Sequence, residues 1–292
     1  MAEQAHAASA RLRLSSSYVL ILEWLEPYDR LTGTNLYTKL TARNLAARLV
    51  TCHRAQDVRD ALRVALDEIK NDGVPIVHIE SHGDDPTIPL RKRAFGARNE
   101  EISWADLGAA LSPLNRASDF NVLLVGAACW GISASASFRL HDYAPFVGCI
   151  GFATSVGDRS LEDAVAELYR RLLIDREEIG TAVNGAQREL HSPSEKLAFT
   201  TSARLATLSA RGAYEECMRA GSFDDIQHII ARLSALSEEH SRALAIDDWE
   251  AYRLQLAQQH VQKVWNEWFP FEVQRRSPSY QLDWQSFISN TP

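Results

Sequence analysis

Two short apolar segments of this chain each end at a reactive side chain that stands close to a glycine. Residues 74–83 run through a β-branched stretch into His82 and Gly83, and residues 121–131 run into Cys129. Short apolar runs of this kind are typical of buried strands. If the two strands are parallel, their carboxyl ends bring an imidazole and a thiol to one edge of a sheet. The pair therefore predicts a cysteine nucleophile and its base.

The rest of the first two hundred residues alternates between strand and helix patterns. The predicted strands are 18–25, 48–52, 74–80, 122–127 and 146–152. Apolar residues recur at helical spacing over 58–69, 104–111 and 161–172. This alternation predicts an α/β fold class, a mostly parallel sheet with helices on both faces.

Polar segments connect these elements. The stretch from Glu26 to Thr41 contains proline and glycine and is predicted to be a loop, and residues 84–101 form a charged excursion. Ser160 and Asp163 have the spacing of a capping box, which predicts the start of a helix.

The two ends of the chain have a different composition. Residues 1–17 are predicted to be a flexible N-terminal leader, and residues 204–292 a helical C-terminal extension without strands. Trp249, Trp265 and Trp268 follow helical spacing in that extension. They are interpreted as core contacts, with a docking surface as the alternative.

Charge and cysteine usage narrow the class of protein. The formal net charge of −7 argues against direct nucleic-acid binding. No stretch approaches the roughly 20 apolar residues of a membrane span, and the N-terminus has no secretory pattern. The four cysteines are widely spaced and are expected to be reduced thiols in a cytoplasmic protein.

Each residue of the pair also has an ordinary interpretation. A free cysteine after an apolar strand is often a small buried hydrophobe, and a histidine at a strand end often only holds a loop. The same placement of His82 and Cys129 on their own strands favours a joint catalytic role. The imidazole would accept the thiol proton, and the N–H groups of Gly83 and Cys129 would bind the oxyanion.

Other chemistries fit the sequence less well. His78, Glu80 and His82 superficially suggest a zinc motif, but four residues of strand separate the histidines by about 13 Å. Gly126 to Gly131 resembles a nucleophile elbow with its first glycine misplaced, and that fold places its histidine after the nucleophile, where His141 and His191 lie. No nucleotide-binding loop is present, so neither a metal nor a cofactor is predicted.

The arrangement resembles the CHAT group of prokaryotic caspase-like cysteine peptidases. Ser81-His82-Gly83 and Ala128-Cys129 lie 47 residues apart, histidine first, each after a strand. The resemblance covers residues 18–203. It continues through the segments 102–107, 150–158, 166–173 and 179–188. Trp130 departs from the family pattern, which often has a small or acidic residue there.

The resemblance implies a caspase-like peptidase domain over residues 18–203. It implies an endopeptidase that cleaves a protein substrate through a thioester intermediate, in bacterial antiviral defence or signalling. A regulatory sensor or activator protein is then an expected partner. The alternative is an inactive caspase-like scaffold that binds a protein partner through its helical extension.

Two residues near the pair are candidates for substrate binding. Asp158 follows the strand at 146–152, where related peptidases often place pocket residues, and it would bind a basic side chain. An aspartate at the start of a helix is an equally ordinary interpretation. Trp130 is expected to narrow the cleft beside Cys129.

Overall fold

The computed structural model describes residues 16–83, 90–92, 100–137, 143–219 and 249–270, together with Gln274, Leu282 and Trp284. The chain divides into two units. The sheet unit comprises residues 2–139 and 144–202, and the helical unit comprises residues 1, 140–143 and 203–292. Of the predicted leader, residues 1–17, all but the last two residues lie outside the described ranges. The candidate dyad belongs to the sheet unit.

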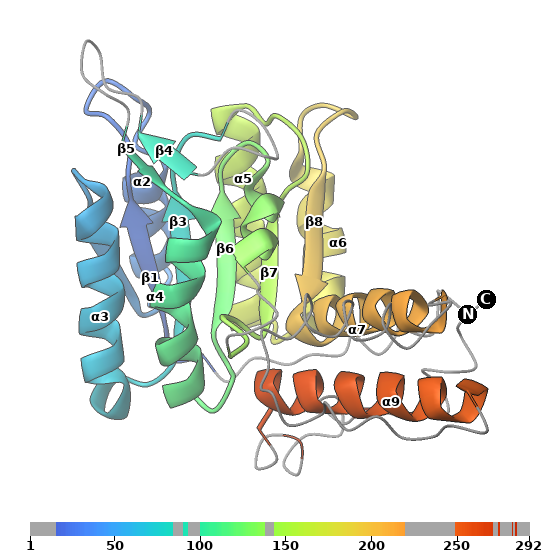
Figure 1. Cartoon of the computed structure of the whole chain (residues 1–292). Helices are drawn as coiled ribbons and strands as arrows, with labels where there is room; N and C mark the ends of the chain where they lie inside the picture. Colours follow the sequence, from blue (N-terminus) through green and yellow to red (C-terminus); the bar gives the residue numbers. More distant parts are fainter. Residues whose placement is uncertain are drawn as a thin grey trace. The chain divides into compact units, whose positions relative to one another are not determined.

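A six-stranded sheet forms the centre of the sheet unit (Figure 1). Its order is β2 (Ala47–Thr51), β1 (Tyr18–Glu23), β3 (Pro75–Glu80), β6 (Leu123–Ala127), β7 (Gly148–Phe152) and β8 (Leu197–Thr201). All neighbouring pairs are parallel except β7 and β8, which are antiparallel. The predicted α/β fold class is confirmed, and the mostly parallel sheet flanked by helices is consistent with a caspase-like fold.

The central strands are buried at every position because helices cover both faces of the sheet. This holds for β1, β3, β6 and β7, whereas the edge strand β2 is partly exposed. Continuous apolar runs such as Tyr18 to Leu22 are typical of strands buried on both faces.

Two helix layers cover this sheet (Figure 1). On one face α3 (Ala55–Asp72) packs against α4 (Trp104–Ala117). On the other face α5 (Asp158–Tyr169) lies between α2 (Thr32–Thr41) and α6 (Ile179–Ala186). Short helical turns at 131–137, 170–174 and 187–189 complete the set. A small antiparallel pair, β4 (Leu90–Lys92) and β5 (Glu100–Ile102), lies within the predicted excursion.

The loop predicted over residues 26–41 is wrong from Thr32 onward, where α2 begins. This helix buries Leu36 and Leu40, which stand four residues apart on one face. With so few apolar positions, its amphipathic pattern is too short to recognise against the polar background.

Carboxylates from the sheet hold the first turn of α2, whose N-cap residue Leu31 offers no side-chain acceptor. Glu23 at the end of β1 accepts hydrogen bonds from the Thr34 N–H (2.7 Å) and hydroxyl (2.8 Å). Glu80 at the end of β3 accepts one from the Thr32 hydroxyl (2.6 Å). Glu23 thus satisfies one backbone N–H of the first helical turn, and Glu80 ties that turn to β3.

Two further details differ from the sequence prediction. The strand β8 was not predicted, since it is a short antiparallel strand at the sheet edge. The capping box predicted at Ser160 is wrong, because α5 begins at Asp158 after Gly157. Ser160 instead accepts a hydrogen bond from the His191 N–H at 3.1 Å.

The helical unit contains α7 (Ser202–Arg219), apart from its first residue, and α9 (Trp249–Trp268). Its apolar cluster comprises Ala210, Tyr214, Ala257 and Val261, with Met218, Leu254, Leu282 and Trp284 against it. Trp265 and Trp268 are buried and their rings pack edge to face, which confirms the core interpretation for these two residues. The side chain of Trp249 lies outside the described set. No helix of the described ranges is long and apolar enough to cross a bilayer.

Candidate active site

The register between β3 and β6 places His82 and Cys129 at the same level of one sheet edge. Glu80 pairs with Ala127 across the two parallel strands. His82 and Cys129 each lie two residues beyond that pair, past the carboxyl ends of their strands (upper edge in Figure 1). Carboxyl ends of parallel strands are the usual place for reactive groups in such sheets.

The backbone segments after the two strands are in direct contact. A Cβ added to Gly83 would lie 1.9 Å from the carbonyl oxygen of Cys129 and 3.5 Å from the Ala128 Cβ. Only a residue without a side chain allows this approach. The segment that carries His82 and Gly83 therefore contacts the segment that carries Cys129.

A carboxylate that the sequence analysis missed holds the histidine. His82 Nε2 lies 2.8 Å from Asp29 Oδ2, and the two side chains retain 29% and 19% of their exposure. Asp29 belongs to the loop between β1 and α2, 53 residues away in sequence. Because β1 neighbours β3, this loop emerges at the same sheet edge as His82. The sequence pattern that could have pointed to Asp29 is a polar loop directly after a buried strand.

The chain turns sharply after Cys129. Trp130 has a φ of 59°, a region that bulky residues rarely occupy. Its N–H donates to the Thr154 carbonyl at 3.2 Å. The chain then folds back onto β6, since a Cβ on Gly131 would lie 2.0 Å from the Gly126 carbonyl oxygen. Such a constrained turn fixes where the thiol projects, and strain of this kind often accompanies functional sites.

The loop after β7 contacts the thiol directly. The Val156 N–H donates to Cys129 Sγ at 3.4 Å, and Sγ lies 3.7 Å from the Val156 carbonyl oxygen. Within the described part of the chain, no hydrogen bond joins the thiol to the His82 imidazole. The thiol and the imidazole thus share an edge while each is held by a different loop.

Burial separates Cys129 from two other cysteines. Cys52 and Cys149 are free but fully buried, whereas Cys129 is partly exposed. Burial raises the pKa of the Cys149 thiol to about 12, so that it stays protonated at neutral pH. Cys129 is therefore the most accessible nucleophile of these three.

One candidate substrate-binding residue follows Cys129 directly in sequence, and the other begins the helix after the loop that contacts the thiol. Trp130 is half-buried directly after Cys129. Asp158 is exposed at the first position of α5, two residues beyond Val156. The helix-start interpretation of Asp158 is thus confirmed, and its role in a substrate pocket stays a prediction.

The histidine that suggested a zinc motif has protein partners at both nitrogens. His78 is fully buried, with Nδ1 2.9 Å from the Tyr169 hydroxyl and Nε2 2.8 Å from Glu80 Oε1. Burial and, secondarily, the charge of Glu80 raise the pKa of Tyr169 well above 10. No cluster of three or more potential metal ligands occurs among the described residues.

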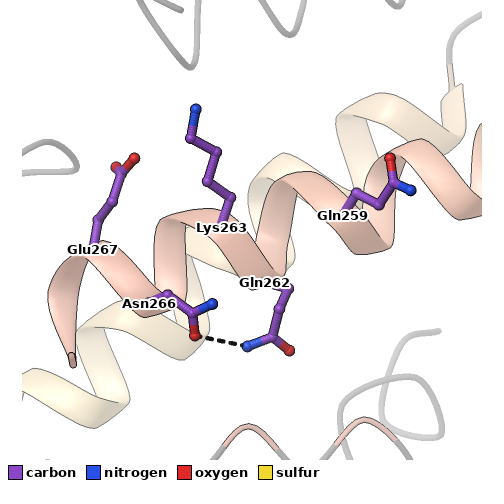
Figure 2. Close-up of a pocket in the computed structure, with 5 residues that line it drawn as sticks. All are labelled: Gln259, Gln262, Lys263, Asn266 and Glu267. Carbon is purple, nitrogen blue, oxygen red and sulfur yellow. Dashed lines mark hydrogen bonds between the residues drawn. The ribbon is translucent and has the colours of Figure 1, made fainter. Parts of the chain in front are cut away.

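A hollow in the helical unit contains no candidate for the cysteine chemistry considered above. It is lined by Gln259, Gln262, Lys263, Asn266 and Glu267, which Figure 2 shows along α9. Gln262 donates a 2.9 Å hydrogen bond to Asn266 within it. These side chains include neither a cysteine nor a histidine.

No protein family model matches the chain, and no curated protein matches its sequence.

Proposed function

We propose that this protein is a caspase-like cysteine endopeptidase with Cys129 as nucleophile and His82 as its base. The observation that carries the proposal is the β3–β6 register, which sets both residues two positions beyond Glu80 and Ala127 on one sheet edge. The contact between Gly83 and the Cys129 carbonyl supports it, because the two segments meet there.

The proposed reaction has two stages. His82 accepts the proton of Cys129 as sulfur attacks the peptide carbonyl, and the N–H groups of Gly83 and Cys129 bind the oxyanion. The C–N bond breaks as His82 returns the proton to the leaving amine, which leaves a thioester. Water, deprotonated by His82, then hydrolyses the thioester and restores the thiol. These steps use no metal or cofactor.

The proposed setting follows from the family resemblance. A protein substrate, with a sensor or activator protein as regulator, fits a peptidase of bacterial antiviral defence. The free thiols of Cys52, Cys129 and Cys149 fit a reducing compartment, which supports a cytoplasmic location.

One observation favours a second candidate, an inactive scaffold that binds a protein partner through residues 204–292. The Cys129 thiol forms its hydrogen bonds with the Val156 backbone and not with His82. Either the binding of a substrate or partner turns this thiol toward His82, or the thiol takes no part in catalysis.

Cleavage of a peptide library, read by mass spectrometry, distinguishes the two candidates. Cys129→Ala and His82→Ala should each abolish cleavage, whereas His191→Ala should retain it, since His191 pairs with Asp163 on the surface. The library also tests Asp158, because a preference for Arg or Lys before the cleaved bond should weaken in Asp158→Ala. Cleavage by Cys129→Ala would refute the peptidase assignment. A wild-type chain that cleaves nothing, even with the products of neighbouring genes present, would favour the scaffold.

A further inference from the structure

We propose that Asp29 is a positioning residue of this site, which fixes the tautomer of His82 so that the imidazole presents its unprotonated Nδ1 to the thiol. This inference rests on the proposed function and deepens it. The activity of the proposed dyad then depends on a third side chain, Asp29, which follows β1, whereas His82 and Cys129 follow β3 and β6.

The hydrogen-bond geometry dictates the tautomer. Asp29 Oδ2 lies 2.8 Å from His82 Nε2. An ionised carboxylate can only accept hydrogen bonds, so Nε2 must carry the hydrogen. In a neutral imidazole the other nitrogen, Nδ1, then holds the lone pair that accepts a proton. A base that acts on Cys129 needs that lone pair.

Asp29 is itself held in a tight turn. The same Oδ2 accepts the Glu26 N–H at 2.9 Å, and the Asp29 N–H donates to the Glu26 carbonyl at 2.9 Å. These reciprocal bonds fix the carboxylate relative to its own loop. The carboxylate is therefore oriented before any substrate binds, as a positioning group requires.

The residue after Asp29 attaches this loop to α5. The Arg30 guanidinium donates through Nε and Nη2 to the two oxygens of Glu162, at 2.6 and 2.8 Å. Glu162 is almost fully buried, and the hydrogen bond from Arg30 lowers its pKa, which keeps it ionised. Bidentate pairs of this kind restrict direction as well as distance.

A second attachment links the start of α2, directly after this loop, to the end of β3, directly before the histidine. The Thr32 hydroxyl donates to Glu80 Oε2 at 2.6 Å, and Glu80 stands two residues before His82 on β3. Glu80 is also bonded to the buried His78. Asp29 and His82 are thus carried by two segments that a buried hydrogen bond joins, so their contact is built into the fold.

The isosteric substitution Asp29→Asn tests the proposal. An asparagine that keeps its oxygen on the Glu26 N–H offers Nε2 a neutral acceptor in place of a carboxylate, and one that turns its NH₂ group toward Nε2 moves the hydrogen to Nδ1. Both orientations weaken the preference for the tautomer that can act as base. We expect kcat to fall by roughly 10²-fold or more, with KM changed by less than about threefold. Asp29→Glu, which retains a carboxylate, should recover part of kcat. Glu68→Gln removes a carboxylate that pairs with Arg48 on the surface and touches none of these residues, so it should keep kcat.

The ¹⁵N chemical shifts of the His82 ring provide a measurement that does not need activity. The wild type should show Nε2 protonated and Nδ1 unprotonated at neutral pH, and Asp29→Asn should shift this balance toward Nδ1–H. Wild-type kcat in Asp29→Asn, or loss of kcat with an unchanged tautomer, would overturn the proposal. If the wild type cleaves nothing while the tautomer still shifts, the peptidase assignment fails and the hold of Asp29 on His82 stands. An unchanged tautomer in that case overturns both.

Discussion

Gly83 and Cys129 are in backbone contact, so that a Cβ on Gly83 would lie 1.9 Å from the Cys129 carbonyl oxygen. The atom that such a Cβ would meet belongs to the backbone, which cannot move aside as a flexible side chain can. This contact fixes the spacing between the segment that carries the imidazole and the segment that carries the thiol.

Gly83→Ala should therefore push the two segments apart. We expect the free energy of unfolding to fall by about 1–3 kcal/mol, as in other overpacked sites, and peptide cleavage to fall with it. Urea denaturation and the library assay measure the two effects. Gly157→Ala is the matched control, because its Cβ would meet nothing closer than Glu195 Oε1 at 3.6 Å. Equal stability of the two variants would contradict the described contact.

Thr32→Val should destabilise the fold by removing a buried hydrogen bond without changing side-chain shape. Glu80 would lose the donor to its Oε2 while remaining buried, a change that costs about 1–3 kcal/mol. Thr38→Val on the exposed face of the same helix should change the free energy of unfolding by less than about 0.5 kcal/mol. Matching urea midpoints for the two variants would show that the Thr32–Glu80 bond is unimportant.

Glu167 should make stability depend on pH in the acid range. Hydrogen bonds from Arg170 and then Arg171 lower its pKa from the ordinary 4.5 to about 2. Because the folded pKa is the lower one, the stabilisation is present above about pH 4.5 and is lost as the pH falls toward 2.

Glu167→Gln tests this dependence. The variant should lose about 1 kcal/mol at pH 7, and its difference from the wild type should shrink as the pH falls from 4.5 to 2. Unfolding midpoints across this range provide the measurement. Glu68→Gln, which breaks an exposed pair with Arg48, should have a smaller effect at pH 7. If the difference in stability between Glu167→Gln and the wild type grew as the pH fell, the expected sign would be wrong.

The central strands could be predicted because their burial requires continuous apolar segments, which are visible in the local sequence. Segments such as Tyr18–Glu23 and Leu123–Ala127 are buried at every position and are apolar almost throughout. The alternation of these runs with helical spacing was enough for the fold class. It was also enough to place His82 and Cys129 beyond strand ends.

Features that depend on distant residues could not be predicted in the same way. The first turn of α2 is capped by Glu23 and hydrogen-bonded to Glu80, neither of which belongs to the helix. Asp29 reaches His82 across 53 residues, and recognising that pair requires the order β1–β3–β6, which the sequence pattern does not specify. Local periodicity contains no information about which loops meet at a sheet edge.

The most direct test of the central claim is to map covalent adducts formed by a peptidyl acyloxymethyl ketone, an electrophile that reacts with the nucleophile of cysteine peptidases. Mass spectrometry should locate the adduct on Cys129, with Cys52 and Cys149 unmodified in the folded protein because both are buried. His82→Ala should slow the adduct's formation by about 10²-fold, since it removes the base. An adduct that forms equally fast without His82, or none on Cys129 in the wild type, would contradict the assignment.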